Sequence, residues 1–167
     1  MIVSILILGL VTAQRLGELV LAQRNTRRLV ALGGVERGAG HYPVMVGLHA
    51  AWLVGLWLLG WNRPVNLAWL AVYLGLQVLR VWVLASLGPR WTTRIIVVPG
   101  ETLVRKGPYR FMAHPNYAVV AGEIAVLPLA FGLAAYAAVF SLLNASLLWV
   151  RIRTEAAALK AASPPES

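Results

Sequence analysis

The stretch of the sequence best equipped for chemistry runs from Lys106 to Tyr117 and reads KGPYRFMAHPNY. In it, His114 directly precedes Pro115, and Arg110 lies four residues before His114. Proline is favoured at the first position of a helix, where its missing N–H group costs nothing. The free N–H groups of a helix start, together with the helix dipole, attract anions. We therefore expect His114, Arg110 and these amides to converge on a negatively charged group, although a capped loop-to-helix junction fits the same residues equally well.

A second pair of charged residues, Arg151 and Glu155, follows the last apolar stretch of the chain. Residues four apart lie on one face of a helix. The turn around Gly132 is short, so the helix that begins after His114 should lie beside the helix that ends at Arg151. We expect His114, Arg151 and Glu155 to face one pocket. The simpler alternative is a flanking charge with a weak ion pair between Arg151 and Glu155.

Four further charged residues, Arg15, Glu18, Arg80 and Glu123, lie inside apolar stretches. A charge at the centre of a membrane span costs at least about 2.5–3.5 kcal/mol. Arg15 and Glu18 share a helix face and form either a local ion pair or part of a site. Arg80 lies too deep for its side chain to reach the surface, so we expect an acidic partner for it. Glu123 is either that counterion or, as we prefer, a carboxylate in a polar pocket.

The remaining histidines are His41, just before the second apolar stretch, and His49, inside it. The chain has three histidines and no cysteine. Without cysteine or a recognisable ligand spacing, these histidines do not predict a metal site. The sequence also lacks the glycine-rich loops typical of dinucleotide and phosphate binding.

The elements that must position these residues are membrane helices. Hydrophobic residues make up 59% and charged residues 13% of the 167 residues, whereas a soluble domain carries roughly 25% charged residues. The mean hydropathy is +0.72. We predict an all-α integral membrane protein with about five transmembrane helices. The apolar stretches that predict them are Ile2–Leu21, Val44–Trp61, Val65–Leu87, Tyr117–Phe131 and Ala135–Val150.

A single transmembrane domain is expected over residues 1–160, followed by a disordered tail at 161–167. The first apolar stretch should remain as a span, because no basic region precedes it and Arg15 and Glu18 interrupt its apolar run. A span needs about 20 residues, and the last two stretches are shorter. With the turn at Gly132, they predict a helical hairpin at the C-terminal end.

The basic residues predict the orientation. The net charge is +9, which in a soluble protein would indicate nucleic acid. Here, 12 of the 15 basic residues fall in three segments, 22–43, 88–113 and 151–160, that alternate to the same side of the membrane. Because positive loops stay in the cytoplasm, we expect a multi-pass protein of the cell membrane with its N-terminus outside, its C-terminus in the cytoplasm and no nucleic-acid partner.

Two of these segments should carry local structure. Residues 22–43 begin basic and become glycine-rich, which predicts an interfacial helix followed by a loop. Ile95–Val98, Pro99-Gly100 and Thr102–Val104 predict a short β-like hairpin before the C-terminal helices.

Three motif blocks in order resemble those of the isoprenylcysteine carboxyl methyltransferase family of membrane enzymes. They are Gly107-Pro108-Tyr109-Arg110, His114-Pro115-Asn116-Tyr117, and Arg151-Ile152-x-x-Glu155. The N-terminal half is similar to a bacterial branch that O-methylates long-chain alkylresorcinols or alkylpyrones. The residues that carry this second resemblance are Gln14-Arg15-Leu16-x-Glu18-Leu19, Arg24-Asn25, Glu36-x-Gly38, His41-Tyr42-Pro43 and Leu48-His49.

The resemblance implies S-adenosylmethionine as the methyl donor, bound at the cytoplasmic ends of the last two helices. It places Arg151 and Glu155 at the reacting end. The prenylcysteine enzymes usually end the motif with two acidic residues, and here the second is Ala156. This departure favours a long-chain phenol or pyrone over a prenylcysteine as the lipophilic acceptor. The cofactor site would be lined by Tyr109, Arg110, His114, Pro115, Asn116 and Tyr117.

The role of each catalytic residue depends on the acceptor. A carboxylate needs only Arg151 to orient it, whereas a phenol must lose a proton to a base. Glu123, His41 and Glu155 are the candidate bases. The competing class of function is a small transporter or scaffold, in which Arg80 and Glu123 would form a relay, but no internal repeat of the kind typical of transporters is present.

Overall fold

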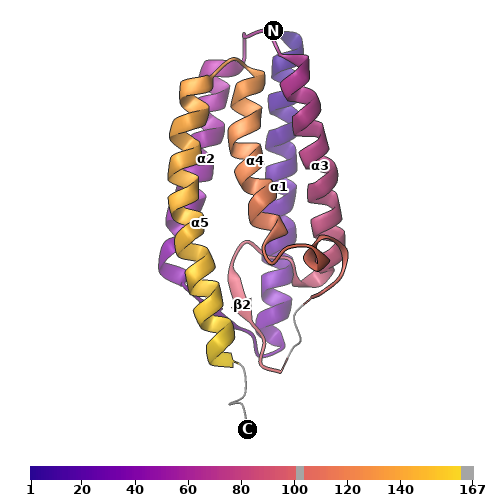
Figure 1. Ribbon diagram of the computed structural model, residues 1–167, viewed down its shortest axis with the longest axis vertical. Helices are drawn as coiled ribbons and strands as arrows, with labels where there is room; N and C mark the ends of the chain where they lie inside the picture. Colours follow the sequence, from indigo (N-terminus) through magenta and orange to yellow (C-terminus); the bar gives the residue numbers. More distant parts are fainter. Residues whose placement is uncertain (101–103, 163–167) are drawn as a thin grey trace.

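The chain forms one bundle of helices. The computed structural model describes residues 1–100 and 104–162, with side chains up to 158. Figure 1 shows the helices of this part running along the long axis, with α4 in the middle of the bundle. Their bounds are α1 Ile2–Ala31, α2 Tyr42–Gly60, α3 Leu67–Leu87, α4 Pro115–Ala130 and α5 Ala134–Ala162.

The described residues include four helices that are long and apolar enough to cross a membrane, namely α1, α2, α3 and α5. Large apolar side chains also cover the outside of the bundle. Leu10, Val78 and Leu142, from three different helices, are each about 70% exposed. A soluble protein would not leave so much apolar surface in water. The prediction of an all-α integral membrane protein is therefore confirmed.

The predicted C-terminal hairpin is also confirmed. Gly132 has φ +69°, a left-handed conformation that glycine adopts without strain. Leu133 then donates its backbone N–H to the Pro128 carbonyl at 2.9 Å, which closes the turn. The 16 residues of α4 rise about 24 Å, at about 1.5 Å per residue. Because α4 ends and α5 begins at this turn, the first residues of α4 lie level with the Arg151 region of α5.

The core of the bundle is apolar and lies near the hairpin turn. Trp52, Leu56, Leu127 and Phe131 are almost completely buried there. The indole N–H of Trp52 donates to the Ile124 carbonyl at 3.2 Å, which ties α2 to α4. This packing holds α4 along its length and leaves its N-terminal end beside the loops.

The connection between α1 and α2 differs from the prediction. The basic residues after position 22 continue α1 as far as Ala31, so the expected separate interfacial helix is absent there. Strand β1, Val35–Arg37, and the short helix η1, Ala39–His41, then lead into α2.

The strand predicted before Pro99 is present, and it pairs with a segment that the sequence did not single out. Ile95–Val97 does form a strand, β2, but it pairs antiparallel with β1, with Glu36 opposite Ile96. Arg94 donates to both oxygens of Glu36 at 2.8 Å and so fixes this pairing. Thr102 and Leu103, the expected partners, lie outside the described residues. Short helices η2, Gly88–Arg90, and η3, Gly107–Arg110, flank this region.

The predicted tail at 161–167 begins inside a helix. Helix α5 continues to Ala162, and residues 163–167 lie outside the described part of the chain.

Candidate active site

The charged residues inside the helices form one network. Arg80 of α3 donates to both oxygens of Glu18 at 2.5 and 2.6 Å, and to Glu123 at 2.6 Å. Arg15 donates to Glu123 at 2.8 Å and to Glu18 at 3.1 Å. The expected acidic partner of Arg80 is thus confirmed, and there are two. With two positive and two negative groups, the network is neutral, as a buried charge requires.

Glu123 is the counterion of this network. Its side chain has 0% exposure, and Gln77 donates to its second oxygen at 2.8 Å. Both carboxylate oxygens are therefore engaged by donors on α1 and α3. The counterion alternative for Glu123 describes the structure better than the preferred one of a carboxylate facing a pocket.

A cavity of about 460 Å³ lies where the start of α4 meets the end of α5, and we call it the helix-end cavity. Its volume falls in the range of about 300–1,000 Å³ that is typical of small-molecule sites. Most of the residues predicted to form the site meet in its wall: Tyr109, His114, Asn116, Tyr117, Arg151 and Glu155.

Glu155 contacts residues at the start of α4. The Tyr117 hydroxyl donates to Glu155 Oε2 at 2.7 Å, and His114 Nδ1 lies 3.8 Å from the same oxygen. The His114 and Tyr117 rings are stacked, with centroids 5.3 Å apart. Arg151 does not pair with Glu155 but donates to the Thr93 carbonyl at 3.0 Å. The predicted meeting of the two helix ends is confirmed, and the predicted weak ion pair between Arg151 and Glu155 is wrong.

Tyr109 reaches this cavity from η3, outside the membrane-spanning helices. Burial, followed by the negative charge of Glu155, raises the pKa of the Tyr109 hydroxyl. A raised pKa keeps this hydroxyl protonated, so it remains a hydrogen-bond donor.

Four predicted residues line neither of the two cavities described here. Arg110 is exposed on η3, with its guanidinium 6.0 Å from the Phe111 ring, because η3 turns its side chain away from the helix ends. Besides His114 and Arg151, the basic residues that line the helix-end cavity are Arg90 and Arg105. Neither Glu123 nor His41 is among the lining residues of the two cavities described here. Pro115 is buried as the first residue of α4 and shapes the backbone.

A second, narrower cavity of about 190 Å³ extends between α1, α2, α4 and α5, and we call it the interhelical cavity. Apolar side chains such as Leu53 and Leu148 make up much of its wall. Polar and charged side chains of the network, Arg15, Glu18 and Arg80, also reach it. An apolar cavity with few polar groups is the usual form of a site for a lipophilic ligand.

The two cavities share part of their wall. The residues that line both are Trp91, Thr92, Asn116, Tyr117 and Arg151. The indole N–H of Trp91 donates to Asn116 Oδ1 at 3.3 Å, which orients the Asn116 amide. Arg151 is only 4% exposed, and its Nε has no partner in the described part of the chain. We call these five residues the junction.

Two functional candidates were missed from the sequence, His49 and Asn144. Both line the interhelical cavity. His49 was noted among the histidines and in the second resemblance, but without a role, and Asn144 was not noted. The signal for Asn144 was present, since an amide inside the apolar run Ser141–Val150 is costly unless it has a partner.

Comparison with known proteins agrees with this geometry. Residues 69–161 match the family described as the isoprenylcysteine carboxyl methyltransferase (ICMT) family. The chain is 41% identical over 160 residues to the uncharacterized protein YpbQ of Bacillus subtilis (strain 168), with 93% of this chain and 95% of that protein covered. No solved structure matches the chain. The family match covers the whole junction and most of the wall of the helix-end cavity, and the chain belongs to the isoprenylcysteine carboxyl methyltransferase family.

Proposed function

We propose that this membrane protein is an S-adenosylmethionine-dependent O-methyltransferase, acting on a lipophilic acceptor such as a long-chain phenol or pyrone. The observation that carries the proposal is the junction. A roomy cavity at the helix ends and a narrow cavity between the helices share Asn116, Tyr117 and Arg151. A donor in the first cavity and an acceptor in the second would meet there.

The helix-end cavity has the groups that this cofactor needs. When bound, S-adenosylmethionine supplies a methyl group on a positively charged sulfur. Glu155 and the Tyr117 ring suit a cation, by charge and by cation–π attraction respectively. Tyr109 offers a hydroxyl donor, and Arg105 and His114 suit a carboxylate. The residues present therefore fit the cofactor.

The chain's own contribution to the reaction is to orient the acceptor and to take its proton. Arg151 Nε, which is buried and unpartnered, would hold the acceptor oxygen at the junction. The Tyr117 hydroxyl would receive the acceptor's proton while passing its own to Glu155, 2.7 Å away. Of the three candidate bases, Glu155 is the one that lines a cavity. The walls of the two cavities would exclude water and align the reactants, which is most of what methyl transfer requires.

The same proposal sets the orientation in the membrane. Basic residues gather at the end of the bundle that holds β1, β2 and the helix-end cavity, and Arg63 lies at the other end. By the positive-inside rule, the cavity would open to the cytoplasm of the cell, where S-adenosylmethionine is made. The acceptor would enter sideways from the membrane.

A transfer assay in detergent tests the function. We expect the purified protein to move a labelled methyl group from S-adenosylmethionine to an alkylresorcinol. Arg151→Gln should lower kcat/KM about 10-fold to 150-fold, because a charged hydrogen bond at the reacting oxygen is worth roughly 1.5–3 kcal/mol.

The matched control is Arg153→Gln. Arg153 is on the same helix but exposed, with its guanidinium 3.8 Å from the Trp149 ring centroid, and should keep full activity. Equal activity of the two variants would remove Arg151 from the site. Transfer to a prenylcysteine and none to a phenol would refute the acceptor class, and no binding of S-adenosylmethionine would favour a transporter or scaffold.

A further inference from the structure

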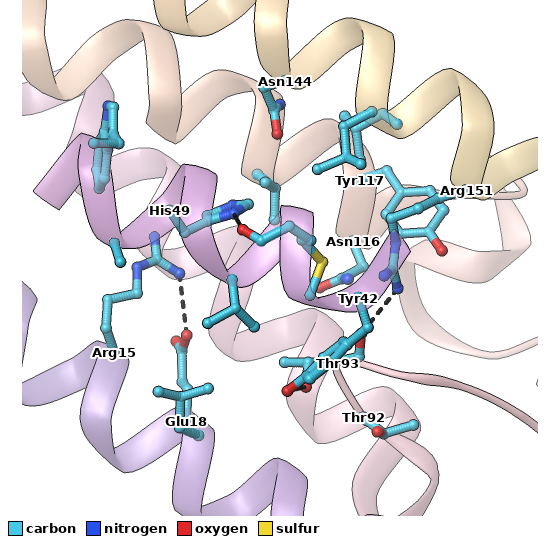
Figure 2. A pocket seen from close by; sticks show the side chains of 18 of the residues that line it. Arg15, Glu18, Tyr42, His49, Thr92, Thr93, Asn116, Tyr117, Asn144 and Arg151 are labelled. Atoms are coloured by element: carbon cyan, nitrogen blue, oxygen red, sulfur yellow. Dashed lines mark hydrogen bonds and ion pairs between the residues drawn. The ribbon is translucent and has the colours of Figure 1, made fainter. Parts of the chain in front are cut away.

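The interhelical cavity holds a buried amide without a partner. Asn144 of α5 is 1% exposed, and its Oδ1 has no hydrogen bond in the described part of the chain. Its side chain points into the cavity, as Figure 2 shows. A buried polar group left without a partner costs about 1–3 kcal/mol. Such a group is therefore expected to have a partner when the cavity is filled.

His49 of α2 presents a second unused group to the same cavity. Its Nδ1 lies 2.8 Å from the Met45 carbonyl oxygen. Because a carbonyl only accepts, Nδ1 carries the hydrogen, and the neutral ring has its lone pair on Nε2. In Figure 2, Asn144 and His49 approach the cavity from opposite helices, away from Arg151 and Tyr117.

These residues define two polar levels in the cavity. Arg151 and Asn144 are seven residues apart on α5, and Tyr42 and His49 are seven apart on α2. Seven residues are about two turns, so each pair lies on one helix face, with roughly 10 Å between its members. The Tyr42 hydroxyl lies 3.3 Å from Thr93 Oγ1, next to the carbonyl that Arg151 contacts. The first level is therefore at the junction, and the second is formed by Asn144 and His49.

The two levels select a kind of acceptor. The rise of about 10 Å separates backbone positions, and the side chains of both levels extend into the cavity between them. A ligand that contacts both levels must carry two polar groups, and two hydroxyl groups on one aromatic ring meet this condition. Both Asn144 Oδ1 and His49 Nε2 accept hydrogen bonds, so the group at the second level should be a donor.

We propose that Asn144 and His49 are specificity residues that bind a second hydroxyl group of the acceptor while the first is methylated. The inference rests on the proposed function and extends it to a dihydroxy ring. Binding at the second level would also orient the acceptor, because a ring held at both ends presents one oxygen to the junction. A ring with one hydroxyl would leave the second level unpaired.

Binding without the cofactor tests this directly. Trp52 and Trp91 line the cavity, so quenching of their fluorescence reports its occupancy. The two probes are a long-chain alkylresorcinol and the alkylphenol of the same chain length. We expect the wild type to bind the resorcinol about fivefold to tenfold more tightly, the size of one or two neutral hydrogen bonds.

Substitutions at the second level should remove this preference. Asn144→Leu should weaken resorcinol binding about fivefold to tenfold and leave phenol binding unchanged or stronger. Asn144→Ser, which supplies a hydroxyl oxygen as an acceptor, should restore part of the preference. His49→Phe repeats the test from another helix, in case the first variant is poorly folded. Leu148→Ala, a truncation in the same wall, should change the affinities for both probes by the same factor.

The outcomes separate the two proposals. If the variants at Asn144 and His49 keep the wild-type ratio of affinities, the specificity inference is overturned, while methylation of the resorcinol by the same wild-type preparation still supports the function. If the wild type neither binds nor methylates the resorcinol, the proposed acceptor class fails and this inference fails with it.

Discussion

Glu123→Gln separates a structural role of the buried carboxylate from a catalytic one. The substitution keeps the shape of the side chain and removes its charge. Glu123 contacts Arg80 at 2.6 Å and Arg15 at 2.8 Å, and it is completely buried. Without it, the network of two acidic and two basic residues carries a net positive charge inside the bundle.

The expected cost follows from these contacts. At an effective dielectric constant of about 20, two unit charges about 4 Å apart attract each other by about 4 kcal/mol. Glu123 has two such partners, but its loss also relieves repulsion from Glu18. Removing one member of a buried ion pair typically costs about 3–5 kcal/mol, and we expect a loss of this size. For a chain of this length, it lowers Tm by on the order of 10 °C.

Thermal unfolding in detergent measures this loss. The double variant Arg15→Gln/Glu123→Gln leaves the Arg80–Glu18 pair neutral, so it should recover most of the stability. As a control, Glu36→Gln breaks the pair with Arg94, whose side chain is 37% exposed, and should cost under about 1 kcal/mol. A Glu123→Gln variant that melts like the wild type but transfers no methyl group would refute the reasoning and make Glu123 the general base.

Two further predictions concern the proton path and the orientation. Tyr117→Phe removes the hydroxyl that donates to Glu155. We expect kcat to fall about 10²-fold to 10⁴-fold, the usual contribution of general acid–base catalysis, while the affinity for S-adenosylmethionine stays within about threefold, roughly 0.7 kcal/mol. An unchanged kcat would rule out the proton relay through Tyr117. Because the chain has no cysteine, a single cysteine introduced in place of Arg63 or Arg27 can be labelled in intact cells with a membrane-impermeant maleimide. Only the cysteine at position 63 should react. Labelling at position 27 alone would show that the proposed topology is inverted.

The parts of the fold that could be predicted are those that depend on the free-energy cost of placing a short stretch of residues in the membrane or in a turn. Apolar length predicts the helices, and Gly132 with its short turn predicts the hairpin. Arg80 predicted an acidic partner, because a guanidinium at that depth is not tolerated alone. The two carboxylates that it contacts, from α1 and α4, follow from the same reasoning. That both of them meet at Arg80 depends on helix packing, which the sequence alone does not show.

The misplaced predictions share a different cause. The pairing of β1 with β2 joins residues about 60 positions apart, and strands of three residues have too little alternation to specify a partner. Arg110 was assigned to the cofactor by its position in a motif, but its side chain on η3 is exposed and does not line the helix-end cavity. Asn144 and His49 were overlooked because uncharged polar residues stand out less in an apolar stretch than charged ones do.

The buried network also acts at a distance on the junction. Glu123 lies eight residues after Pro115, about 12 Å along α4, and its contacts tie this helix to α1 and α3. The tight turn at Gly132 ties the same helix to α5. Because a helix transmits position along its axis, fixing Glu123 and the turn together fixes where Asn116 and Tyr117 meet Arg151. In the proposed reaction, the network would therefore support methyl transfer by holding the two helix ends in register, and none of its carboxylates would have to take the proton.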